Sequence, residues 1–148
     1  MTLEAILAAF HLLAILTFVV FLSSQAALCR IEWLNAAVVE RLARLDVICG
    51  VAGAVMIGSG QARLIWGVKG ASWYLSQPLF HIKITLVLAM VVLSFVPSAA
   101  FRRWRQILRS TGALPPAAEV ARVRRLVMIQ SHVLPVVAVI AVFWARGW

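Results

Sequence analysis

Acidic residues are scarce in this sequence, and charge of either sign is sparse. The 148 residues include only 5 Asp and Glu, and charged residues make up 13% of the chain against 64% apolar residues. A soluble domain carries roughly a quarter of its residues as charges, because its surface must stay hydrated. The composition therefore excludes an ordinary soluble domain and predicts an integral membrane protein.

Motifs for nucleotide binding, nucleophilic catalysis and metal binding are also missing. The 2 cysteines and 3 histidines do not occur at the short spacings that form a zinc or iron site. No P-loop, dinucleotide fingerprint or nucleophile elbow is present. Cys29 and Cys49 fall near the same predicted membrane border, so we expect two reduced, packed thiols and no disulfide.

Long apolar runs fill most of the chain and predict helical spans at about residues 3–28, 40–66, 79–109 and 116–145. Each run reaches the ~20 residues that a helix needs to cross the hydrocarbon core. Lipid offers no partner to backbone N–H and C=O groups, so each run must be helical. The predicted fold class is all-α: a membrane-spanning up-and-down four-helix bundle with a basic helical extension, forming a single transmembrane domain over residues 1–148.

Basic residues give a formal net charge of +9 and gather at two membrane borders. They lie between the first and second runs and between the third and fourth, at Arg30, Arg41, Arg44, Arg102, Arg103, Arg105, Arg109, Arg122, Arg124 and Arg125. By the positive-inside rule these loops face the cytoplasm of a bacterial inner membrane, and both termini face the periplasm. The expected partners are the bilayer and its anionic headgroups, and no nucleic acid.

Small residues recur every four positions in the second run. Gly50, Ala54 and Gly58 form a flat stripe, which Gly53 and Gly60 widen, and such a stripe lets another helix approach closely. The main interpretation is a close helix contact, and the alternative is a cofactor ring lying against the glycines.

Ionisable residues inside the spans carry the functional signal, because such residues are rare in membranes and usually face the bundle interior. From a rise of 1.5 Å per residue, His11 lies roughly 10 Å, Lys83 roughly 7 Å and Arg63 roughly 4 Å below the outer border. We predict that these three residues bind a cofactor, with His11 as a ligand of haem iron and the two cations holding anionic groups.

Each of these residues also has a purely structural interpretation. His11 can be a packed histidine with a polar partner, Lys83 can extend its ammonium to the border, and Arg63 can anchor a helix end. His81 lies about 200° around the helix from Lys83, so only one of them can face a common site. His132 lies roughly 8 Å deeper than His11, which disfavours a haem held by both histidines.

Asp46 is the acidic residue nearest the membrane at the basic border. Arg44 precedes it by two residues, and the cluster at residues 102–105 is predicted to lie at the same border. We expect a structural ion pair there.

Several segments carry a resemblance to known families. The strings LAAFHLLAILTFVVFL, RLARLDVICGVAGAVMIGSGQARL, PLFHIKITLVL and VARVRRL resemble an uncharacterised bacterial family of four-helix integral membrane proteins, over nearly the whole chain. A His early in the first helix and a Lys early in the third are distantly similar to HemJ-type protoporphyrinogen oxidases and CopD-type membrane proteins. That resemblance implies bound haem b or a porphyrin, with His11 and Lys83 at the positions of the polar pair.

Two functions of different class stay open from the sequence. One is a haem- or porphyrin-associated redox protein built on His11, Lys83 and Arg63. The alternative is a non-enzymatic accessory or assembly subunit, whose small-residue stripe and basic hairpin pack against a membrane-complex partner or a second copy of the chain. The sequence leaves enzymatic activity undecided.

Overall fold

The computed structural model describes residues 2–66 and 71–145, so residue 1, residues 67–70 and residues 146–148 of the expected domain lie outside the described part. The elements in chain order are α1 (Thr2–Leu28), the 3-10 helix η1 (Ile31–Trp33), α2 (Ala36–Trp66), α3 (Ala71–Leu75), α4 (Pro78–Thr111) and α5 (Ala117–Ala145). No strand occurs among these described residues.

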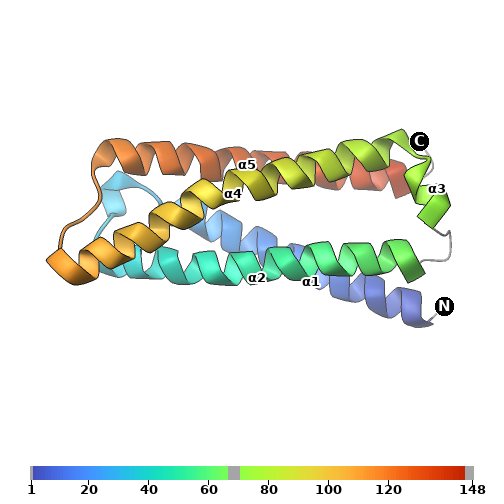
Figure 1. Cartoon of the computed structure of the whole chain (residues 1–148), viewed down its shortest axis with the longest axis horizontal. Coiled ribbons are helices and arrows are strands. Elements are labelled where there is room, and N and C mark those ends of the chain that lie inside the picture. The colour runs from blue at the N-terminus through green and yellow to red at the C-terminus, as the bar shows by residue number, and fades with distance from the viewer. Residues whose placement is uncertain (1, 67–70, 146–148) are drawn as a thin grey trace.

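Four of these helices, α1, α2, α4 and α5, are long and apolar enough to cross a membrane. They run up and down, so that α1 begins at the end of the bundle where α5 ends (Figure 1). Neighbours in sequence pack together, α2 contacts α4, and α1 closes the bundle against α5. The predicted all-α membrane bundle is confirmed. We call the end with η1 and residues 112–116 the arginine-rich end, and the opposite end the termini end.

Helix boundaries follow local chemistry. Pro78 is the first residue of α4, where its missing N–H costs nothing. The basic stretch continues α4 to Thr111, two residues beyond the predicted span of 79–109. Gly112 ends the helix with a φ of 72°, and its N–H donates to Leu108 O at 2.9 Å. This left-handed conformation favours glycine.

The tightest packing lies at the arginine-rich end. Phe101 and Trp104 of α4 are 0% and 1% exposed, and their ring centroids stand 5.5 Å apart, edge to face. The largest side chains buried with them come from the other long helices and the α1–η1 connection: Leu22, Cys29, Val39, Leu42, Val120, Val123 and Val127. A soluble-like core therefore joins the helices where they leave the expected hydrocarbon.

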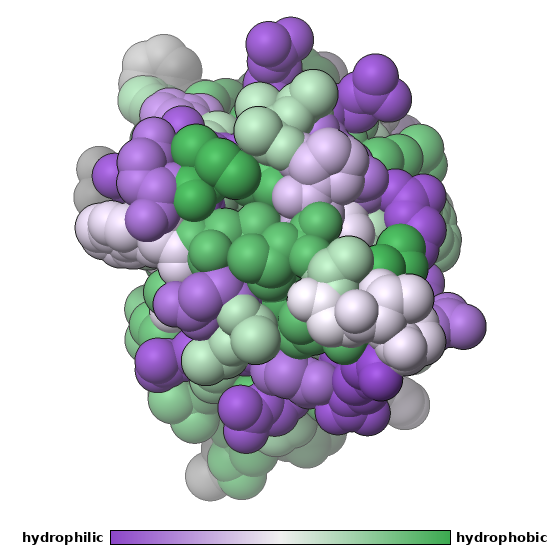
Figure 2. All heavy atoms as spheres, turned by 90° about the vertical axis from the view of Figure 1, so that its left-hand side faces the viewer, coloured by the Kyte–Doolittle hydropathy of each residue, from purple (hydrophilic) through white to green (hydrophobic). Residues whose placement is uncertain are grey.

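Polar contacts hold the helical extension onto this core. Arg109 of α4 donates from two nitrogens to the Glu40 carboxylate of α2, at 2.6 and 2.9 Å. Glu119 in the first turn of α5 pairs with Arg103 and accepts a hydrogen bond from Trp104 Nε1 at 2.5 Å. Viewed end on, hydrophilic side chains surround an apolar centre (Figure 2).

The small-residue stripe of α2 faces away from the bundle, so the close helix contact expected of it stays a prediction about a helix outside the bundle. Ala54 is exposed, and a Cβ added at Gly50 or Gly58 has nothing within 4 Å. The close approach uses the adjacent face, where a Cβ at Gly53 stands 3.3 Å from Phe18 of α1. Helical periodicity alone does not predict which of the two small-residue faces of α2 packs against another helix of the bundle.

Candidate functional site

The imidazole of His11 is held against α2 in the half of the bundle nearest the termini end. Its Nδ1 lies 2.8 Å from Ser59 Oγ, and that hydroxyl donates to Met56 O at 3.1 Å. Because the Ser59 hydroxyl donates its proton to the Met56 carbonyl, it can only accept from the imidazole. We therefore assign the imidazole proton to Nδ1, which donates to Ser59 Oγ. In this tautomer Nε2 carries the lone pair of the neutral ring. The backbone of Met56 also acts on the imidazole.

Gly60 makes room for this ring. A Cβ at Gly60 would stand 3.2 Å from His11 Cε1, tighter than most real contacts. Ser59 and Gly60 thus act together, one fixing the ring by a hydrogen bond and the other leaving space beside it. Ser59 is 7% exposed, so its hydrogen bond is sheltered from solvent.

Two cations lie near His11. Arg63 follows Ser59 by one helical turn on α2, and Lys83 comes from α4. Both charges act electrostatically on His11, and Arg63 also acts on Lys83. The structure therefore brings together His11, Arg63 and Lys83, although their binding of a cofactor stays a prediction.

Aromatic rings surround the Lys83 side. The Lys83 ammonium lies 5.2 Å from the centroid of the Trp144 ring, a cation–π distance. Trp144 also packs against Trp73 at 6.1 Å and Phe80 at 6.0 Å, measured between ring centroids. Lys83 is half-buried, and its contact with Trp144 places the ammonium beside the last turn of α5. A charged group at this place is consequently bordered by flat apolar surfaces.

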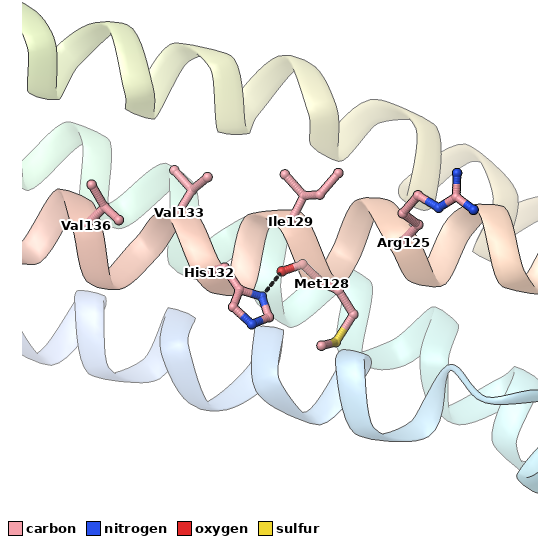
Figure 3. Close-up of a pocket in the computed structure, with 6 residues that line it drawn as sticks. All are labelled: Arg125, Met128, Ile129, His132, Val133 and Val136. Carbon is pink, nitrogen blue, oxygen red and sulfur yellow. Dashed lines mark hydrogen bonds between the residues drawn. The ribbon is translucent and has the colours of Figure 1, made fainter.

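The other two histidines lie elsewhere. His81 is exposed, and its Nε2 bonds Leu75 O at 2.8 Å. His132 is exposed on α5, and its Nδ1 donates to Met128 O at 2.6 Å (Figure 3). Neither residue joins the site around His11. Among the described residues, no group of three or more His, Cys, Asp or Glu side chains is placed to hold a metal ion.

A second polar cluster crosses the bundle nearer the arginine-rich end. Ser98 Oγ of α4 donates to Asp46 Oδ1 of α2 at 2.7 Å, and Arg102 Nε donates to Ser98 O at 3.2 Å. Gln25 of α1, 3% exposed, is the neighbouring amide. The predicted ion pair of Asp46 is wrong, because within the described chain no cation lies within 4 Å of it and a serine takes that place.

Sequence reasoning missed Ser59 and Gln25. Ser59 has a visible signal, because it precedes Arg63 by four residues and so shares its helix face. Gln25 has a weaker one, since a lone amide near a helix end is usually hydrated. Only the packing of α1 against its neighbours shows that it is buried.

The fold and these buried polar groups define an integral membrane four-helix bundle. The chain belongs to the family described as "Predicted membrane protein (DUF2214)", whose model matches residues 3–148. No curated protein and no solved structure matches the chain. The resemblance to a four-helix membrane family is thus confirmed, whereas the likeness to HemJ-type and CopD-type proteins stays a prediction.

Proposed function

We propose that this membrane protein is a haem- or porphyrin-associated redox protein, which holds haem b or a porphyrin at the His11 site. In this proposal His11 Nε2 would bind the haem iron. Arg63 and Lys83 pair with the carboxylates at the edge of the ring system. The observation that carries the proposal is the His11–Ser59 hydrogen bond, because it assigns the ring proton to Nδ1 and the lone pair to Nε2.

The surroundings of His11 fit such a ligand in three respects. A histidine that binds metal usually donates its other N–H to a neighbour, which fixes the ring and its tautomer, and Ser59 is such a neighbour. Arg63 and Lys83 supply positive charge for carboxylates. The rings of Trp73, Phe80 and Trp144 offer apolar surface beside Lys83.

Single rather than double histidine ligation is proposed, because His81 and His132 are exposed and neither joins the site around His11. Bound haem supplies one-electron chemistry. The chain's own contribution is to orient His11 through Ser59 and to keep compensating positive charge beside the ligand.

For orientation, we propose that the arginine-rich end faces the cytoplasm of a bacterial inner membrane, with both termini in the periplasm. The positive-inside rule supports this arrangement. The proposed ligand site then lies in the periplasmic half of the membrane.

The test is the absorption spectrum of protein purified in detergent after expression with added haem precursor. Wild type should show a Soret band, and His11→Ala should lose it. His132→Ala is the matched control, because it removes an exposed imidazole and should leave the band unchanged. Colourless wild type, or equal loss in both variants, would contradict the proposal.

A second candidate function is that of an accessory subunit, which the outward face of α2 supports. Gly50, Ala54 and Gly58 present a smooth exposed stripe, the kind of surface on which membrane helices associate. Crosslinking in native membranes should then give an adduct with a second copy or another subunit. Gly58→Leu should weaken that adduct, whereas exclusively monomeric protein would argue against this function.

A further inference from the structure

Two hollows adjoin on the surface of α5 at the arginine-rich end. The first, of about 510 Å³, is lined by Arg125, Met128, Ile129, His132, Val133 and Val136. Figure 3 shows Arg125, Ile129, Val133 and Val136 projecting from one edge of α5 and Met128 and His132 from the other. Apart from Arg125 and His132, this lining is apolar.

The second hollow, of about 460 Å³, lies between η1 and the first turns of α5 and is more polar. Its charged residues are Arg30, Glu32, Arg124 and Arg125. Arg125 and Met128 line both hollows, so the two are continuous. A polar compartment thus opens directly into an apolar groove.

The polar compartment carries excess positive charge. Three arginines face one carboxylate, and that carboxylate, Glu32, is exposed. Arg124 Nε is buried and has no hydrogen-bond partner, which is costly for a charged donor. Two other acidic residues at this end form ion pairs with other arginines, since Glu40 pairs with Arg109 and Glu119 pairs with Arg103. Within the described residues, none of the three arginines forms an ion pair.

The length of the apolar groove matches one membrane leaflet. Arg125 and Val136 are eleven residues apart on α5, which at 1.5 Å per residue spans about 16 Å. Half of a hydrocarbon core of about 30 Å is about 15 Å. A molecule with an anionic head at Arg125 and an extended apolar tail therefore fills both hollows.

We propose that these hollows form a binding site for one anionic phospholipid, with its phosphate among Arg30, Arg124 and Arg125 and an acyl chain along Ile129, Val133 and Val136. Guanidinium groups pair well with phosphate oxygens. A phosphate there also supplies a counter-charge for the Arg124 guanidinium, which lines the polar hollow. Free phosphate would leave the adjoining groove unfilled, and this is why the lipid is the occupant. The site is separate from the proposed haem site and does not depend on it.

The test is native mass spectrometry of the full chain in detergent, titrated with phosphatidylglycerol or phosphatidylcholine. Wild type should bind one phosphatidylglycerol at least tenfold more tightly than phosphatidylcholine. Arg125→Gln should weaken that binding about fivefold, and Val136→Trp should weaken it by filling the groove. Arg122→Gln is the matched control, because it removes an exposed charge from the same helix outside both hollows, and it should have no effect.

Further measurements distinguish a lipid site from its alternatives. Glycerol phosphate without acyl chains should not compete, and phosphatidylglycerol should raise the melting temperature of wild type more than that of Arg125→Gln. Competition by glycerol phosphate would overturn the lipid assignment. Equal weakening by Arg122→Gln would show general charge attraction and would overturn the site, as would equal binding of both lipids or no bound lipid. Circular dichroism confirms that each variant is folded.

Discussion

The two ends of this bundle are built differently. At the arginine-rich end, Phe101 and Trp104 are fully enclosed, and ion pairs tie α4 to α2 and α5. In the half nearest the termini end the buried residues include Ala14, Ser59, Met90 and Val137, which are smaller than Phe101 and Trp104. Large side chains there face outward instead: Leu3, Ile6, Phe10, Ile65, Trp66 and Phe143 are all at least half exposed.

This contrast separates stability from ligand binding. A densely packed core fixes helix positions at one end, because every enclosed side chain adds dispersion and burial. The other half has fewer such contacts and contains the polar residues around His11. Functional sites commonly occupy the less stable part of a structure. Lipid, which is as apolar as the exposed side chains, covers that half without cost.

The largest effect is expected from Trp104→Ala. It removes a side chain that is 1% exposed together with its hydrogen bond to Glu119. The free energy of unfolding should fall by about 3–5 kcal/mol, as for other buried aromatic truncations. Unfolding in mixed detergent micelles measures this, with Trp66→Ala, 62% exposed at the other end of the bundle, as the control. Equal losses of unfolding free energy in both variants would show that the two ends of the bundle do not differ in packing.

Cys29 reports on enclosure at the arginine-rich end. It is 0% exposed, and burial raises the pKa of its thiol to about 11. The reactive thiolate is therefore scarce at pH 8, and maleimide labelling should be at least a hundredfold slower than at an exposed thiol. Labelling should increase as the pH rises towards that pKa.

Peptide mass mapping measures the modification at Cys29, and Ser110→Cys supplies an exposed thiol at the same end as a control. Fast labelling of Cys29 at pH 8 in folded protein would show that the arginine-rich end opens readily and is not the more tightly packed end.

Gly60→Ala tests the half of the bundle nearest the termini end, which contains the proposed ligand site around His11. Its Cβ would press on His11 at 3.2 Å, so haem loading should fall severalfold. Stability should change by only about 1 kcal/mol or less, because the half is loosely packed. Gly58→Ala is the matched control, since nothing lies within 4 Å of its Cβ. The Soret absorbance per protein and the unfolding midpoint measure the two effects. Unchanged haem loading in Gly60→Ala would show that Gly60 does not contribute to the ligand site.

The smallest effect is expected from Glu40→Gln. It breaks the surface ion pair with Arg109, and exposed pairs contribute little because water screens them. The melting temperature should fall slightly in low salt, and the difference should vanish in 1 M NaCl, where the Debye length is about 3 Å. Glu32→Gln is the control, because Glu32 forms no ion pair within the described chain. A large decrease in melting temperature that does not depend on salt would show that this ion pair behaves as a buried one.

Sequence patterns predicted the fold well because lipid permits few alternatives. Run length and backbone hydrogen bonding required four helices. The approach of His11, Arg63 and Lys83 followed from their depths and from the rule that ionisable residues in a span face the bundle interior. Rotation about the helix axes did not, so the outward turn of Gly50 and Gly58 and the serine partner of Asp46 could not be predicted. Side-chain contacts between helices depend on how each helix is rotated in the bundle, and a single sequence does not show that rotation.

Haemin titration of ligand-free protein tests the central claim most directly, with absorbance read in the Soret region. Wild type and Trp104→Ala, where the latter stays folded, should both bind one haemin per chain. His11→Ala should lose that binding while keeping the unfolding midpoint of wild type. Haemin binding that persists in His11→Ala, or a failure of wild type to bind it, would contradict the account.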